Sequence, residues 1–221
     1  MASVWVVDSN CFIHVGSMAP NGFLTDLKKI LESEDSTLYV TPGVHGEIKT
    51  VRFQRWPGQP NLLEEIRDLV ITVTIDEAEV KALAQQIGEK ASPQDVDLSL
   101  MILGSKLAHE GHKVTLVSDD FKMTTTGEKV NLNFETCPPS TFLQRLADSG
   151  DAGQRTRMRS LSRRVRAAEM RYAISRAGQY DIQAKLTWMV DSLLSSRIAL
   201  AEDVEDTSEP DESKLIAGLI R

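Results

Sequence analysis

Cysteine and aromatic residues are scarce in this sequence. The chain has 221 residues, of which two are cysteines and 5% are aromatic. Two cysteines cannot build a disulfide framework, and the sequence contains no Cys-x-x-Cys pair to bind zinc. Because aromatic side chains are few, aliphatic side chains must fill most of the core.

The chain also lacks the hydrophobic segments that would direct it to a membrane. No stretch approaches the roughly 20 apolar residues that a membrane-spanning helix needs. The first residues show neither the basic region nor the apolar region of a signal peptide. We therefore expect a cytoplasmic protein that makes no membrane contact.

Basic residues are in the minority overall, but they are concentrated in one segment. The formal net charge is −7; residues 1–150 carry −8, residues 151–180 carry +6 and residues 181–221 carry −5. A negative net charge disfavours a general polyanion-binding protein. The reversal of sign within residues 151–180 instead predicts one local basic surface.

Strand and helix patterns alternate along the first 150 residues. Apolar or β-branched runs predict strands at 4–7, 38–40, 70–75, 113–118 and 130–134. Apolar side chains at helical spacing predict helices at 24–31, 42–51, 62–69, 76–87, 92–111 and 138–146. The helix at 92–111 is predicted to start with Ser92 as its N-cap and Pro93 in its first turn. This alternation is typical of an α/β fold with a mainly parallel sheet of four to five strands.

The sequence predicts three segments. Residues 1–148 form an α/β domain, a linker follows at 149–153, and residues 154–200 form a basic helical hairpin. Residues 201–221 form an acidic tail that ends in a short helix. Within this tail, residues 202–212 have the composition of a disordered segment.

Four acidic clusters fall where a parallel sheet would bring them together. They are Asp8, Glu47, Asp95 with Asp97, and Asp119 with Asp120. The first and last clusters follow buried strands, at the strand ends where open α/β sheets bind ligands. Gathered carboxylates repel one another unless a cation neutralises them, and Mg²⁺ prefers oxygen ligands. Each acid alone could be a turn former, a helix cap or a solvated residue, so the predicted cation site depends on the whole set.

The same motifs resemble those of the PIN-domain nuclease family. The matching stretches lie between residues 4 and 146: Val6-Val7-Asp8-Ser9-Asn10, residues 41–48, residues 92–100, residues 116–121 and residues 138–143. Each stretch is short and weakly specific, but the four acidic motifs in this order and spacing are together quite specific. The resemblance implies a three-layer α/β/α domain with a C-terminal helical extension, as in archaeal-type members.

The resemblance also implies an activity, a cofactor and a set of site residues. It implies a metal-dependent endoribonuclease that hydrolyses RNA phosphodiester bonds, in ribosomal or transfer RNA processing, with Mg²⁺ or Mn²⁺ as cofactor. The implied catalytic residues are Asp8, Glu47, Asp97 and Asp119; the implied metal ligands are these four together with Asp95 and Asp120. Ser9, Asn10 and Ser118 would orient the carboxylates.

The third acidic position has two candidates. The Ser-x-x-Asp pattern favours Asp95, whereas the small residue Gly104, seven positions after Asp97, favours Asp97, because members of the family often have a small residue there. Asp97 is the preferred interpretation, with Asp95 kept as the alternative.

Two groups of residues predict contact with RNA, and neither suggests DNA. Arg52, Arg55 and Trp56 follow Glu47, and arginine beside an aromatic ring can hold phosphate and stack unpaired bases. Arg157, Arg159, Arg163, Arg164 and Arg166 lie on an amphipathic helix, where guanidinium groups suit phosphate. The alternatives are core packing for Trp56, and a solvated face or pairing with the acidic tail for the helix.

Other interpretations remain open. A toxin-like ribonuclease of the VapC type would share the acidic motifs, although such chains usually lack so long an extension. A PIN-like fold could also serve as a non-catalytic RNA-binding or assembly module. The apolar stripe of Ile182, Leu186, Met189 and Leu193 could pack on the preceding helix or form a homodimer with a second copy of the chain.

Overall fold

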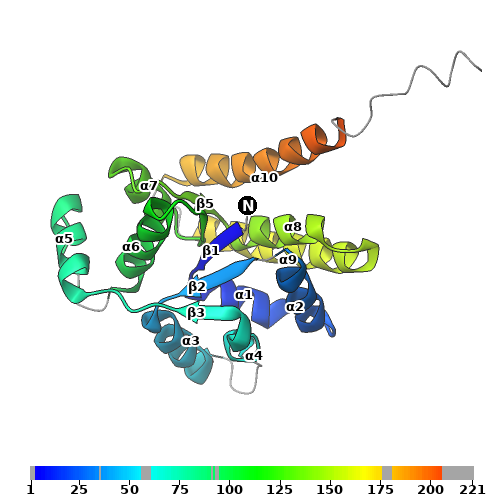
Figure 1. Ribbon diagram of the computed structural model, residues 1–221, viewed down its shortest axis with the longest axis horizontal. Coiled ribbons are helices and arrows are strands. Elements are labelled where there is room, and N and C mark those ends of the chain that lie inside the picture. Colours follow the sequence, from blue (N-terminus) through cyan, green and yellow to red (C-terminus); the bar gives the residue numbers. More distant parts are fainter. Residues whose placement is uncertain are drawn as a thin grey trace, which may run out of the picture.

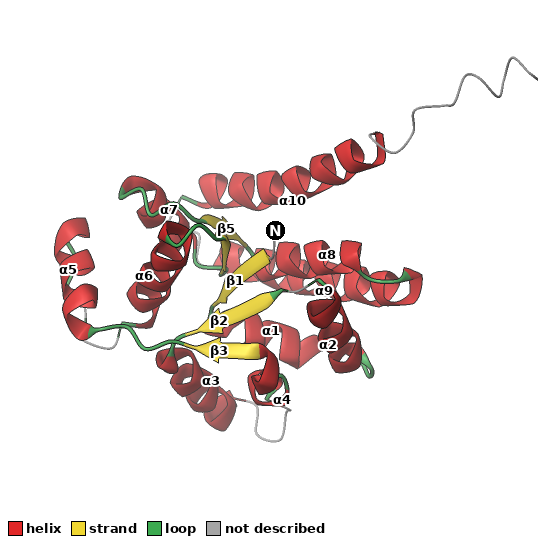
Figure 2. Ribbon diagram, in the orientation of Figure 1, coloured by secondary structure: helices red, strands yellow, loops and turns green. Residues whose placement is uncertain are grey.

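Among the residues that this computed structural model describes, five short strands form one all-parallel sheet at the centre (Figure 2). They are β1 (Ser3–Val7), β2 (Thr37–Val40), β3 (Val70–Thr72), β4 (Lys113–Val117) and β5 (Glu135–Cys137). Their order is β3-β2-β1-β4-β5, and each neighbouring pair is parallel. The structure describes residues 3–34, 36–55, 61–90, 92, 95–175 and 181–205. The predicted α/β fold with a sheet of four to five strands is confirmed.

Helices cover both faces of the sheet and give three layers (Figure 1). They are α1 (Ser9–Met18), α2 (Phe23–Ser33), α3 (Pro42–Arg55), α4 (Leu62–Glu65), α5 (Glu77–Ile87), α6 (Val96–His109), α7 (Phe121–Lys129), α8 (Pro139–Ser149), α9 (Ala152–Ser175) and α10 (Ile182–Glu205). Helices α1, α2, α8 and α9 pack against one another on one side of the sheet. Helix α6 packs on β1 and β4, with α5 and α7 beside it.

The central strands are buried on both faces, which explains their continuous apolar sequence. Val6, Val7, Leu116 and Val117 are at most 1% exposed. Burial of this kind is expected for a parallel strand covered by helices on each side. Because β1, β2 and β4 run in the same direction, the residues that follow them meet at one edge of the sheet.

The predicted strand at 130–134 is wrong. Residues Phe121–Lys129 form α7, which the sequence pattern did not predict, and the edge strand β5 begins only at Glu135. Asn131 and Asn133 have φ angles of 53° and 56°, in the left-handed region, so they interrupt an extended chain. Phe134 instead packs between α6 and α7, where its ring faces Gly104 and Gly127.

The predicted N-cap of the helix at 92–111 is also wrong. Helix α6 begins at Val96, and the side chain of Asp95 accepts a hydrogen bond of 3.1 Å from the backbone N–H of Leu98. Serine and aspartate are N-caps of similar strength, so the sequence Ser-Pro-Gln-Asp by itself does not choose between them. Pro93 lies outside the described residues.

Smaller differences concern the elements near β1 and β3. The sequence pattern contained no prediction for α1, although Cys11, Phe12 and Val15 have helical spacing and are buried. The predicted helix at 62–69 is split into α4 and a 3₁₀ turn at Arg67–Leu69. Strand β3 covers only the first half of the predicted strand at 70–75.

Helix α9 packs into the same core as the sheet. Met158, Leu161 and Val165 are at most 1% exposed and belong to one apolar cluster with the residues of β1 and β4. The two predicted C-terminal helices are confirmed, but the linker between α8 and α9 shrinks to Gly150 and Asp151. The division into segments at residue 148 stays a prediction.

Helix α10 crosses above α8 and continues away from the sheet (Figure 1). Residues 202–205 belong to this helix and not to an irregular tail; residues 206–221 lie outside the described residues. Among the helices that the structure describes, none is both long and apolar enough to cross a lipid bilayer.

Candidate cation site at the carboxyl edge of the sheet

The carboxyl ends of three strands position most of the acidic residues. Asp8 directly follows β1, and its backbone N–H donates to the carbonyl oxygen of Val117 at 3.0 Å, which keeps this point in register with β4. Glu47 lies in the second turn of α3, which starts right after β2. Asp97 lies in the first turn of α6. These positions surround one edge of the sheet, as the sequence predicted.

The acidic residues line a cleft of about 890 Å³. The carboxylates on its wall are Asp8, Glu47, Glu77, Asp95, Asp97 and Asp120. Each of the four predicted clusters therefore contributes at least one residue. Asp119 is the one member of the predicted set that does not line this cleft.

Asp8 lies at the base of the cleft and is held by hydrogen bonds. The residue is only 2% exposed. Ser118 Oγ donates to Asp8 Oδ2 at 2.9 Å, and Asn10 Nδ2 donates to the same oxygen at 3.3 Å. These contacts fix the orientation of the carboxylate; that Asn10 and Ser118 orient a metal-binding group, as the resemblance implies, stays a prediction.

Ser9 lies between two of the acidic residues. Its Oγ is 2.6 Å from Glu47 Oε2 and 3.2 Å from Asp8 Oδ1. A hydroxyl group has one proton to donate, so the shorter contact marks Glu47 as its main acceptor. Ser9 thereby joins the start of α1 to α3.

The crowding of carboxylates changes their proton affinity. Burial, followed by the charges of Asp97 and Asp119, raises the pKa of Asp8 from 3.8 to about 7. Burial, followed by the charge of Asp120, raises the pKa of Asp97 from 3.8 to about 6. Carboxylates that disfavour one another's ionisation are the electrostatic condition for cation binding. In the part of the chain that the structure describes, however, no three His, Cys, Asp or Glu side chains are arranged to enclose a metal ion.

The geometry separates the two candidates for the third position. The carboxylate of Asp95 serves as the N-cap of α6, whereas Asp97 exerts the strongest charge effect on Asp8. The small size of Gly104 has another explanation, because a Cβ atom there would lie 3.0 Å from the ring of Phe134. The charge effect on Asp8 favours Asp97, while helix packing accounts for Gly104.

The side chains of Asp119 and Asp120 lie in different surroundings. Asp119 is 3% exposed, and its Oδ2 lies 3.4 Å from His14 Nε2 of α1. This contact is an ion pair of poor hydrogen-bond geometry, since the same oxygen accepts no hydrogen bond among the described residues. Asp120 lines the cleft and caps α7, where its Oδ1 accepts from the N–H of Lys122 at 2.8 Å. Asp120 is therefore the member of this cluster that faces the cleft.

Sequence reasoning missed two basic side chains beside Asp119, those of His14 and Lys185. Burial lowers the pKa of His14, but the contact with Asp119 and the charges of nearby carboxylates outweigh this effect and raise it above 6.5. Lys185 of α10 is 2% exposed, and its Nζ donates to the backbone oxygen of Asp119 at 2.7 Å. His14 could have been found from the helical spacing of Cys11, Phe12 and Val15. No local sequence pattern could have linked Lys185 to this site, because it lies 66 residues after Asp119 in the chain.

Two of the described arginines of α9 form ion pairs with acidic residues of other helices. Arg157 forms a two-pronged ion pair with Asp26 of α2 at 2.6 and 2.9 Å, and Arg159 donates to Asp148 of α8 at 2.8 Å. Arg163 and Arg164 are exposed.

The other predicted RNA-binding residues are Arg166 on α9 and the group Arg52, Arg55 and Trp56. Arg166 is partly buried and contacts Ser162 Oγ at 3.4 Å. Trp56 and the side chains of Arg52 and Arg55 lie outside the described residues, so their predicted role is not tested.

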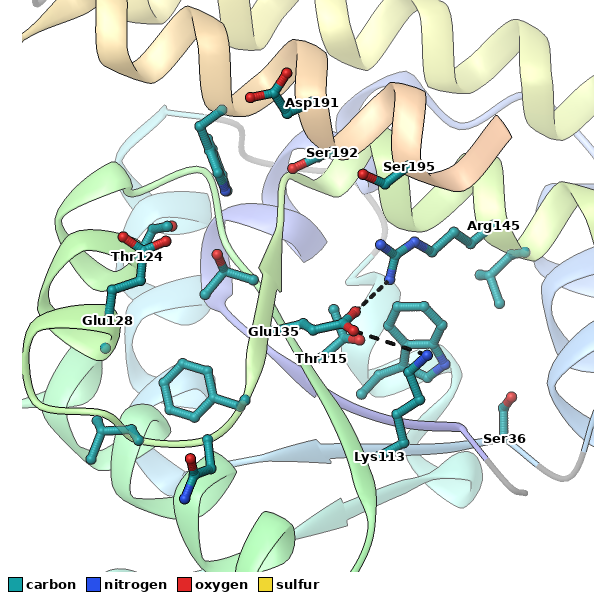
Figure 3. Close-up of a pocket in the computed structure, with 18 of the residues that line it drawn as sticks. Ser36, Lys113, Thr115, Thr124, Glu128, Glu135, Arg145, Asp191, Ser192 and Ser195 are labelled. Carbon is teal, nitrogen blue, oxygen red and sulfur yellow. Dashed lines mark ion pairs between the residues drawn. The ribbon is translucent and has the colours of Figure 1, made fainter. Parts of the chain in front are cut away.

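A second cleft of about 870 Å³ lies between β5, α8 and α10 (Figure 3). Glu135 lies between Lys113 and Arg145, with N···O distances of 3.9 and 3.6 Å. The charged residues along its wall are Glu34, Lys113, Glu128, Glu135, Arg145, Asp148 and Asp191. Acidic residues predominate there, which disfavours a phosphate-rich ligand.

Comparisons with known proteins assign no family to this chain. Models of protein families, curated proteins and solved structures all give no match. A function must therefore be inferred from the geometry of the acidic cleft.

Proposed function

We propose that this protein is a metal-dependent endoribonuclease of the PIN-domain type, with a site built from Asp8, Glu47, Asp97 and Asp120. One observation carries the proposal: Asp8 lies in a cleft lined by other carboxylates, where burial, followed by the charges of Asp97 and Asp119, raises its pKa to about 7, yet Asn10 and Ser118 donate hydrogen bonds to its side chain. A divalent cation would offset the repulsion that disfavours the ionised form of Asp8.

The donor set fits a hard cation. Magnesium and manganese prefer carboxylate oxygens and usually keep several water ligands, so few protein groups are needed. The described carboxylates do not by themselves enclose an ion, so the cation would keep water ligands beside Asp8, Glu47, Asp97 and Asp120. When bound, the cation supplies Lewis acidity that activates water and stabilises the departing oxygen of a phosphodiester.

Polar side chains beside the cleft would hold the carboxylates in place for this chemistry. Ser118 and Asn10 hold Asp8 in one orientation, and Ser9 ties Glu47 to the start of α1. Groups that fix the orientation of a metal-binding carboxylate strengthen its affinity. The side chain of Asp119 faces His14 and not the cleft. Asp119 would therefore act on the site indirectly, through the effect of its charge on Asp8.

RNA is the substrate class that we propose. Arg163 and Arg164 on the exposed side of α9 are the described arginines best placed to meet phosphate. Arg157 and Arg159 pair with Asp26 and Asp148, which belong to α2 and α8 and not to the acidic tail that was the alternative partner. A cytoplasmic setting and action on ribosomal or transfer RNA precursors remain part of the proposal.

Incubation with RNA and Mn²⁺, with and without EDTA, tests the proposal. We expect cleavage that requires Mn²⁺ and is abolished in Asp8→Asn protein. Asp68→Asn is the matched control, because Asp68 is 82% exposed and belongs to the 3₁₀ turn. Absence of metal-dependent cleavage, or equal cleavage by Asp8→Asn and wild-type protein, would reject the proposal.

A non-catalytic RNA-binding or assembly module is the second candidate. The observation in its favour is that the described carboxylates do not enclose a metal ion. Metal-independent RNA binding without cleavage, unchanged in Asp8→Asn protein, would support it over the first.

A further inference from the structure

Helix α10 reaches the acidic edge of the sheet through two contacts. Lys185 Nζ donates to the backbone oxygen of Asp119 at 2.7 Å, across 66 residues of sequence. One helical turn later, the ring of Trp188 lies beside that of Phe121, with a centroid distance of 5.8 Å. Both contacts meet the segment that carries Asp120 into the cleft.

The oxygen that Lys185 contacts belongs to a peptide group with a second role. The N–H of this group is that of Asp120, and it donates to Ser118 Oγ at 3.0 Å. Ser118 Oγ in turn donates to Asp8 Oδ2 at 2.9 Å. A continuous chain of hydrogen bonds therefore leads from the ammonium group of α10 to the carboxylate at the base of the cleft. Hydrogen bonds connected in this way polarise and strengthen one another.

The surroundings of Lys185 indicate a fixed position. The residue is 2% exposed, and its Nζ lies 5.9 Å from the ring centroid of Tyr172 on α9. Burial lowers the pKa of Lys185, while the charges of Asp119, Asp120 and Glu169 act in the opposite direction. Burying an amino group is unfavourable unless it is hydrogen-bonded and surrounded by opposite charge, and this pocket provides both.

We propose that Lys185 is a positioning residue of the cation site: it holds the Asp119–Asp120 peptide group so that Ser118 orients Asp8. This inference rests on the proposed function for the identity of the site. It makes α10 part of the nuclease site, so the C-terminal extension would be required for cation binding and not only for contact with RNA.

The test compares Lys185→Met with Met189→Ala in the full-length protein. Met189 lies one turn further along α10 and is 7% exposed, so its truncation weakens the docking of the helix without removing the amino group. Two quantities are measured: hydrogen exchange of the Asp120 amide by NMR, and Mn²⁺ affinity by titration. We expect faster exchange and about tenfold weaker Mn²⁺ binding in Lys185→Met only, a loss typical of groups that orient metal ligands.

The direction of the change in Mn²⁺ affinity shows whether Lys185 acts by holding the peptide group or only through its positive charge. Removing a positive charge near the site would by itself strengthen cation binding, whereas loss of positioning weakens it. Unchanged exchange at Asp120, or unchanged or stronger Mn²⁺ binding, would overturn the inference. If the wild-type protein binds no Mn²⁺, the proposed function fails, and the exchange measurement alone decides whether Lys185 holds the segment.

Discussion

Asp8 is buried among carboxylates and is also the residue at the centre of the proposed cation site. It stands in a strand-end position that the fold buries, and the neighbouring carboxylates disfavour its charge. Its hydrogen bonds to Ser118 and Asn10 nevertheless suit an ionised acceptor. A carboxylate in this situation should respond to both pH and divalent cations.

The stability of the metal-free protein should depend on pH through Asp8. With a pKa raised from 3.8 to about 7, the folded state keeps a proton that the unfolded state has lost. Its contribution to stability is therefore full below 3.8 and is lost as the pH rises through 7. Asparagine cannot ionise, so we expect Asp8→Asn protein to be more stable than wild type at about pH 8 in EDTA, with the difference shrinking towards pH 4.

Denaturant unfolding across this pH range measures the difference in the free energy of unfolding. Asp68→Asn provides the control, because it makes the same chemical change at a side chain that is 82% exposed and does not line the cleft. A constant difference between Asp8→Asn and wild type from pH 4 to pH 8 would contradict the assignment of the raised pKa.

Paired substitutions at the start of α6 should separate Asp97 from Asp95. Asparagine is as good an N-cap as aspartate, so Asp95→Asn should preserve the cap to Leu98 and most of the Mn²⁺ affinity. Asp97→Asn removes the charge that acts most strongly on Asp8 and should weaken Mn²⁺ binding by about tenfold or more. Isothermal titration with Mn²⁺ measures both, and a larger loss in Asp95→Asn would reverse the assignment.

At the scale of elements, the width of the cleft depends on how closely α3 approaches α6. A Cβ atom added to Gly43 would lie 2.5 Å from Val96 Cγ2. Glu47 is one turn along from Gly43 on α3, and Asp97 follows Val96 on α6. The absence of a side chain at Gly43 thus allows two acid-bearing helices to meet.

Gly43→Ala should therefore separate the carboxylates of Glu47 and Asp97. Valine is β-branched and rotates little to relieve the clash, so the start of α6 must move. We expect weaker Mn²⁺ binding and a fall in the melting temperature. Gly46→Ala is the control in the same helix: nothing lies within 4 Å of its Cβ position, and alanine there should stabilise the helix by up to about 1 kcal/mol. Equal Mn²⁺ affinity in the two variants would show that Gly43 does not set the cleft width.

Helix α9 should contribute to the stability of the sheet domain. Met158 is fully buried in the main core, whereas Met170 on the same helix is 41% exposed. Met158→Ala should lower the free energy of unfolding by about 2–5 kcal/mol, the range for a buried large-to-small change. Met170→Ala should cost less than about 1 kcal/mol. Similar losses in chemical denaturation would mean that α9 is not integrated into this core.

At the scale of the whole molecule, charge is distributed unevenly over a protein with a net charge of −7. The folded structure neutralises part of the basic segment, because Arg157 and Arg159 pair with acids of α2 and α8. Arg163 and Arg164 are exposed on α9 and belong to the basic surface that we propose RNA would meet.

The salt dependence of RNA binding should show which arginines bind phosphate. Replacing Arg163 and Arg164 by glutamine should weaken single-stranded RNA binding, and it should reduce the slope of log affinity against log salt by about 0.7 for each phosphate that is no longer neutralised. Arg157→Gln is the matched control and should leave the slope unchanged. Fluorescence anisotropy at several salt concentrations measures the slopes, and an unchanged slope in the double variant would exclude this surface.

Much of the fold could be predicted because local patterns agree with it. Continuous apolar runs marked β1 and β4, and helical spacing marked α2, α5 and α8. The pattern failed at 130–134, where Phe134 fills a gap between α6 and α7 that only the folded chain creates. It also failed at the start of α6, where two strong N-caps compete within four residues.

The sequence by itself determined the parallel α/β architecture and the edge of the sheet at which the acids gather, because strand direction follows from the alternation of strands and helices. Only the tertiary structure decided that Asp120 lines the cleft while Asp119 faces His14, and that Arg157 pairs with Asp26. It alone placed Lys185 on the peptide group beside Ser118. Side-chain direction and long-range partners depend on packing between elements far apart in the chain, and local sequence carries no record of that packing.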